Sequence, residues 1–72
     1  SGVPDADLTR AVEAGMTKVN IATSLNQAFT TAVRAYLDEN PKVVDTRKYL
    51  APGREAVAAE VARLLGVLRA RV

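Results

Sequence analysis

The residues of this chain that could do chemistry lie in one short polar stretch and include Lys18, Asn20, Thr23 and Ser24. Thr23 and Ser24 stand where a strong helical pattern begins, and the start of a helix presents unpaired N–H groups and a partial positive charge. Hydroxyls at such a corner favour an anion or phosphate site. A threonine there is also an ordinary helix cap. Asn20 could equally be a buried polar group that joins neighbouring strands, and Lys18 a salt-bridge partner in the protein interior, so these interpretations stay open.

The composition excludes several kinds of chemistry. The 72 residues contain no cysteine and no histidine, which removes thiolate chemistry, disulfides, and the commonest metal ligand and general base. The net charge is +2 with acids and bases interspersed, so a nucleic-acid partner is not indicated. The chain has no apolar run of about 18 residues and no signal-peptide pattern, so no membrane partner is expected and the expected location is the cytoplasm.

Residues 16–22 alternate between apolar and polar side chains, with Val19 and Ile21 on one side, and this pattern predicts a short strand. A single strand in so short a chain has no partner for its backbone hydrogen bonds. We therefore expect the last part of a larger α/β protein. The alternative is a free-standing helical domain in which this segment is a linker.

Helical patterns flank this strand. The predicted elements are a helix over residues 1–15, the strand over 16–22, an outer helix over 23–40, a loop over 41–51 and a C-terminal helix over 52–72. Gly15 and Pro41 are expected to end the first two helices, and Pro52 to begin the third. The apolar face predicted for the outer helix is Leu25, Ala28, Phe29, Ala32, Val33, Tyr36 and Leu37. That of the C-terminal helix is Val57, Val61, Leu64, Leu65, Leu68 and Val72.

Five motifs follow one another over nearly the whole chain: Gly2 to Asp5, Gly15 to Thr23, Ala28-Phe29, Glu39 to Pro41 and Asp45 to Leu50. In this order they closely resemble the C-terminal end of class II ketose-bisphosphate aldolases, the fructose- and tagatose-bisphosphate enzymes. The ordered succession is more specific than any single motif, and it favours the fragment interpretation. The resemblance implies an α/β fold, in which this chain is a mostly helical C-terminal fragment of a (β/α)₈ TIM barrel with residues 16–22 as the last strand.

The resemblance also implies an activity, the reversible zinc-dependent cleavage of a ketose 1,6-bisphosphate to dihydroxyacetone phosphate and glyceraldehyde 3-phosphate. The Zn²⁺ ligands, including a histidine just before Ser1, and the proton-transferring carboxylate would lie upstream. No catalytic or metal-binding residue is therefore expected in this chain, which alone should be inactive. A monovalent cation is a second candidate cofactor. The implied partners are the remainder of the barrel, the sugar bisphosphate and further copies of the complete enzyme.

Four residues of this chain match substrate-binding positions of that family. Asn20 would hydrogen-bond the dihydroxyacetone phosphate portion, and Thr23 with Ser1 would hold its phosphate. Arg47 would bind the distal phosphate across a subunit contact, since its fork donates two parallel hydrogen bonds. A loop salt bridge with Asp45 is the alternative for Arg47.

The stretch Asn20-Ile21-Ala22-Thr23-Ser24 departs from the Asn-x-Asp-Thr-Asp of many fructose-bisphosphate members and looks more like the tagatose group. This departure leaves open which diastereomer is cleaved. A hypothesis of another class is a small helical interaction module without catalytic activity. The arginines that its C-terminal helix could present to phosphate backbones are Arg54, Arg63, Arg69 and Arg71.

Overall fold

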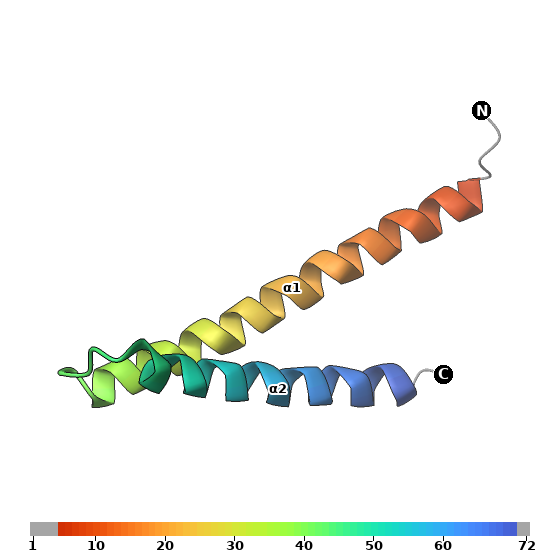
Figure 1. The fold of residues 1–72 in the computed structure, drawn as a ribbon. Helices are drawn as coiled ribbons and strands as arrows, with labels where there is room; N and C mark the ends of the chain where they lie inside the picture. The colour runs from red at the N-terminus through yellow and green to blue at the C-terminus, as the bar shows by residue number, and fades with distance from the viewer. Residues whose placement is uncertain (1–4, 71–72) are drawn as a thin grey trace.

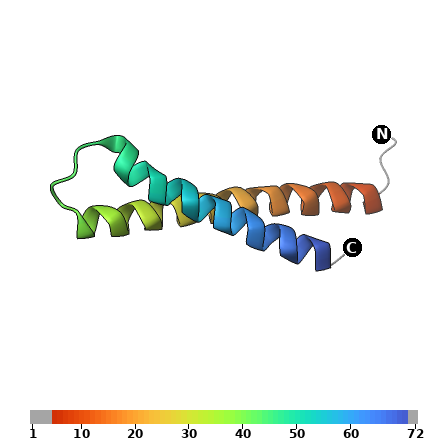
Figure 2. The same ribbon diagram turned by 60° about the horizontal axis from the view of Figure 1, so that its bottom comes forward.

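The computed structural model describes residues 5–70, which form two helices joined by a short turn. Helix α1 runs over Asp5–Glu39 and helix α2 over Thr46–Ala70. The two helices lie together near the turn and diverge toward the termini (Figure 1). Figure 2 shows that they also cross rather than run parallel. The molecule is long and thin, with extents of 59 × 28 × 15 Å, and this shape leaves little room for a core.

The strand predicted for residues 16–22 is not formed, because this segment lies within α1 and the described part of the chain contains no strand. Gly15 does not end the first helix either, and no described glycine has a positive φ. The reason is backbone pairing. A lone strand would leave its N–H and C=O groups without partners, whereas a helix pairs them within the segment. The two helices predicted on either side of the strand are therefore one.

The predicted end of the outer helix is confirmed, since α1 ends at Glu39 just before Asn40 and Pro41. The backbone N–H of Asn40 donates to the Tyr36 carbonyl at 2.9 Å, and its side-chain Nδ2 donates to the same oxygen at 3.0 Å. Asn40 thus pairs a carbonyl that the end of the helix would leave unpaired. A further bond from the N–H of Val43 to the Asn40 carbonyl, 3.2 Å long, closes the turn.

The second helix begins six residues earlier than predicted, at Thr46 instead of Pro52, so the predicted loop over 41–51 is too long. Asp45 explains the difference, because its carboxylate accepts a hydrogen bond from the backbone N–H of Arg47 at 3.0 Å and caps the helix. Pro52 lies inside α2. Its missing N–H removes one hydrogen bond near the start of the helix without ending it.

The two helices pack along the faces predicted from their apolar spacing, although no large side chain is fully buried. Among residues whose burial is described, only Gly53 is buried, and it faces the ring of Phe29. The half-buried side chains of α1 are Ile21, Ser24, Leu25, Ala28, Phe29, Ala32, Val33 and Tyr36. Those of α2 are Tyr49, Leu50, Ala51, Pro52, Ala56, Val57, Glu60 and Leu64. Four residues predicted for the apolar faces, Leu37, Val61, Leu65 and Leu68, are exposed instead, and Val72 lies outside the described residues.

A polar cluster also joins the helices within this contact. The Ser24 hydroxyl on α1 donates a hydrogen bond to Oε2 of Glu60 on α2. Arg63 donates to the same carboxylate twice, from Nε to Oε1 at 2.6 Å and from Nη2 to Oε2 at 2.8 Å. The hydrogen bonds from Arg63 and then Ser24 lower the pKa of Glu60 from 4.5 to about 2. The carboxylate is therefore charged at neutral pH and holds one side chain from each helix.

Replacing Gly53 by alanine should loosen the hairpin. An added Cβ would lie 2.5 Å from a ring carbon of Phe29, and overpacking of this kind costs about 1–3 kcal/mol. Gly66→Ala is the matched control, since a Cβ there meets no atom within 4 Å and should stabilise α2 by about 1 kcal/mol. Urea unfolding followed by circular dichroism should thus move the two midpoints in opposite directions. Equal stabilisation by both changes would show that the helices do not approach each other at Gly53.

Acid should weaken the contact between the helices through Glu60. Because its folded-state pKa is lowered to about 2 from 4.5, its contribution is complete above pH 4.5 and is lost as the pH falls from 4.5 toward 2. Thermal unfolding at a series of pH values should show this loss, and Glu60→Gln should reduce it. Glu55→Gln, an exposed position on the same helix, should leave the wild-type pH dependence. A pH dependence unchanged by Glu60→Gln would contradict the cluster.

Candidate functional site

Two of the four predicted substrate-binding residues, Asn20 and Thr23, lie three positions apart on α1 and are exposed. Residues three apart share one side of a helix, so Asn20 and Thr23 face a common region. Ser24 differs from the other two because it is half-buried against α2. Ser1, the third predicted ligand, lies outside the described residues.

The predicted helix start at Thr23 is wrong for this chain, because Thr23 lies well inside α1. In an α-helix each N–H donates to the carbonyl four residues earlier. The N–H groups at Thr23 and Ser24 are therefore not free to bind an anion. The side chains needed for a phosphate-binding corner are present, but the backbone donors of that corner are engaged within the helix.

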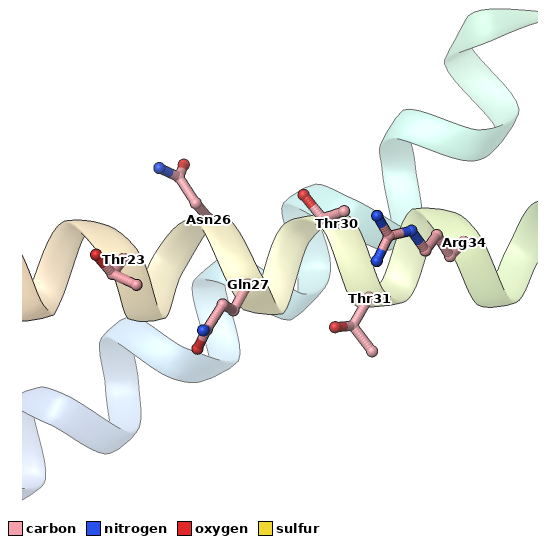
Figure 3. Close-up of a pocket in the computed structure, with 6 residues that line it drawn as sticks. All are labelled: Thr23, Asn26, Gln27, Thr30, Thr31 and Arg34. Carbon is pink, nitrogen blue, oxygen red and sulfur yellow. The ribbon is translucent and has the colours of Figure 1, made fainter.

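Thr23 lines a shallow hollow of about 310 Å³ on the surface of α1, together with amide, hydroxyl and guanidinium side chains (Figure 3). Its lining residues are Thr23, Asn26, Gln27, Thr30, Thr31 and Arg34. Figure 3 shows Thr23 and Arg34 at opposite ends of this row. They are 11 residues apart, which is about 16 Å along a helix. One phosphate cannot contact both, so the hollow is a polar surface with a single cation at one end.

Arg47 lies at the turn, far from Asn20 and Thr23. About 24 Å of helix separates Thr23 from the end of α1 at Glu39. The Arg47 side chain donates to Asp45 from Nε at 3.0 Å and from Nη2 at 2.8 Å, which is the loop salt bridge predicted as its alternative role. These bonds lower the pKa of Asp45 and raise that of Arg47. The Arg47 side chain is still 88% exposed, so an anion can reach it.

The described residues contain no group of three or more acidic, histidine or cysteine side chains that could hold a metal ion. Neither described helix carries an apolar stretch long enough to cross a membrane. Of the arginines considered for an interaction module, Arg63 is paired with Glu60, and Arg54 and Arg69 are exposed. Arg71 lies outside the described part of the chain.

The structure adds Glu60 to the residues around the predicted site, and the sequence pattern did not indicate it. The spacing of Glu60 and Arg63 predicts an ion pair on one helix face. The hydrogen bond from Ser24 to Glu60 joins residues 36 positions apart, so it depends on the register between α1 and α2. Spacing within one helix cannot reveal such a contact.

Comparison with known proteins identifies the family. A family profile described as "Fructose-bisphosphate aldolase class-II" matches residues 1–71. A fructose-bisphosphate aldolase of Thermus caldophilus is 49% identical over 57 residues, which are 79% of this chain and 19% of that protein. One of Geobacillus stearothermophilus is 43% identical over 61 residues, 85% of this chain and 21% of the relative.

The D-tagatose-1,6-bisphosphate aldolase subunit GatY of Klebsiella oxytoca is 39% identical over 67 residues, covering 93% of this chain and 24% of that protein. No solved structure shows a significant match. The chain thus spans about a fifth to a quarter of the length of these relatives. Because the family profile covers all but the last residue, this chain belongs to the class II fructose-bisphosphate aldolase family.

Proposed function

We propose that the complete protein containing this chain is a zinc-dependent class II aldolase that reversibly cleaves a ketose 1,6-bisphosphate to dihydroxyacetone phosphate and glyceraldehyde 3-phosphate. The observation that carries this proposal is the family match over residues 1–71. Relatives named for fructose and for tagatose bisphosphate both match, so the shared substrate class is the ketose 1,6-bisphosphate. The chemistry is an aldol cleavage, in which the C3–C4 bond breaks and the C4 hydroxyl loses its proton.

In that complete protein, the chain forms the C-terminal part of a (β/α)₈ barrel, and residues 16–22 are its last strand. Neighbouring strands would supply the backbone partners that the isolated segment lacks. The exposed apolar side chains of α1 support this proposal, since Val12, Met16 and Val19 are 58%, 59% and 62% exposed. A surface of this kind is normally covered by other protein. The second half of α1 and α2 would then form an outer helical layer.

The break in α1 would also create the phosphate site. With residues 16–22 extended, a helix starting near Thr23 has free N–H groups in its first turn and a favourable dipole for an anion. Thr23 and Ser1 would hold the phosphate of the dihydroxyacetone phosphate portion, and Asn20 on the polar face of the strand would hydrogen-bond that same portion. The exposed positions of Asn20 and Thr23 leave them open to a ligand.

Arg47 would serve the distal phosphate of the substrate. Its separation from Thr23 along the hairpin is too great for both to contact one substrate within a single chain. We therefore place Arg47 at the site of a neighbouring copy, which makes the complete enzyme a homo-oligomer. The cytoplasm is the location we propose for it. Its exposed guanidinium could release the Asp45 carboxylate and bind a phosphate dianion in its place.

The described residues do not fit a zinc site, because they offer no cluster of ligands. We assign the Zn²⁺ ligands and the proton-transferring carboxylate to the chain upstream of Ser1, and any monovalent cation site involves those parts as well. The residues of this chain would bind the substrate and take no part in bond cleavage or proton transfer. The 72 residues alone should accordingly show no zinc-dependent aldol cleavage.

Removing the Thr23 hydroxyl should weaken substrate binding in the complete enzyme. A hydrogen bond to a charged group contributes about 1.5–3 kcal/mol, so Thr23→Ala should raise KM roughly tenfold or more. Thr30→Ala is the matched control, since Thr30 lines the same hollow on α1 but lies two turns further along. Steady-state kinetics with fructose and tagatose 1,6-bisphosphate give the KM of each variant. Equal KM values for the two variants would remove Thr23 from the site.

Val19→Ala should have opposite effects on the short chain and on the complete protein. In the 72-residue chain Val19 is exposed on α1, and alanine is the better helix former by up to about 0.7 kcal/mol. In the complete protein the same change should lower the unfolding temperature, because a β-branched side chain is lost from a packed strand. Thr9→Ala is the control, because its segment is predicted to be helical in the short chain and in the complete protein. This change should increase the helicity of each of them. A stabilised complete protein in the Val19 variant would contradict the strand.

A further inference from the structure

Glu60 is held in one orientation by its own helix. Arg63, one turn later, donates to both carboxylate oxygens, and such paired bonds fix the carboxylate in position as well as adding energy. The Glu60 side chain is only 17% exposed, whereas Arg63 is 60% exposed. The carboxylate therefore lies in the contact between the helices, and its counter-charge comes from the solvent side.

The fixed carboxylate accepts a hydrogen bond from the Ser24 hydroxyl. Ser24 directly follows Thr23 within α1. Successive residues of an α-helix are separated by about 100° around its axis, since a turn holds 3.6 residues. In α1, directing Ser24 toward α2 thus leaves the Thr23 side chain exposed, about 100° around the axis from that contact. Because the two residues are neighbours in the chain, holding Ser24 in place also restricts Thr23 when the helix begins near Thr23. A bond at Ser24 also fixes how far α1 slides along α2.

We infer that Glu60 is a positioning residue for the substrate-phosphate site, and that it acts by holding Ser24 against α2 so that the neighbouring Thr23 faces the substrate. This inference rests on the proposed function, and it assigns Glu60 no contact with the substrate. The apolar contact of Gly53 with the Phe29 ring holds the same two helices together, and half-buried Leu25 lies next to Ser24 in α1. The bond from Ser24 to Glu60 is the polar contact between the helices nearest to Thr23 among the hydrogen bonds of the described residues. Glu60 reaches the site from a second helix.

The test is steady-state kinetics of the complete protein with fructose and tagatose 1,6-bisphosphate. Glu60→Ala and Ser24→Ala should each raise KM roughly two- to tenfold, the range for losing one intramolecular hydrogen bond, with kcat changed less than twofold. The double variant should resemble the single ones, because both remove the same bond. Glu60→Gln retains an oxygen that accepts from the Ser24 hydroxyl and should recover part of the lost affinity.

Glu55→Ala, an exposed acid on the same helix, is the control and should keep the wild-type KM. Unfolding temperatures of all variants separate positioning from stability. If Glu60→Ala lowers the unfolding temperature and the active fraction while KM stays at the wild-type value, Glu60 is only structural and the inference is wrong. Additive effects in the double variant would equally overturn it. A wild-type protein that cleaves neither sugar bisphosphate would instead refute the proposed function itself.

Discussion

The constraint on which this structure depends is that every backbone N–H and C=O needs a partner. Residues 16–22 have the alternation of a strand, but no second strand that could pair with them is present among residues 5–70, which the structure describes. The helix supplies those pairs locally, so α1 runs unbroken from Asp5 to Glu39. Side-chain packing has little part in this outcome, because every described side chain from Thr9 to Asn20 is exposed.

The sequence predicted the parts of the fold that depend on local spacing. The end of α1 at Asn40 and Pro41 was confirmed, as was the half-buried face that includes Phe29 and Tyr36. The start of α2 was predicted at Pro52, but the Asp45 cap lets the helix begin at Thr46, and a proline in the second turn is compatible with such a cap. The strand over residues 16–22 was predicted but is not formed, for a different reason, since a strand depends on backbone partners as well as on its own pattern.

The candidate site could be predicted only in part. The polar residues Asn20 and Thr23 were found from their types and their place before a helical pattern, and the family match supports the resemblance that gave them roles. Their observed helical setting does not itself support those roles, which rest on the complete protein. Glu60 could not be found from the sequence, because its contact with Ser24 depends on the register between two helices.

The cluster around Glu60 has a consequence for how charge is distributed in this chain. Position 24 holds a serine where the resemblance implies an acid in many fructose-bisphosphate members, so a comparison with those sequences position by position would record a lost negative charge. In the fold a carboxylate nevertheless lies beside position 24, because the Ser24 hydroxyl donates a hydrogen bond to Glu60, 36 residues away, and Arg63 pairs with that carboxylate. A substitution at Ser24 or at Glu60 therefore has to be judged together with the residue at the other position.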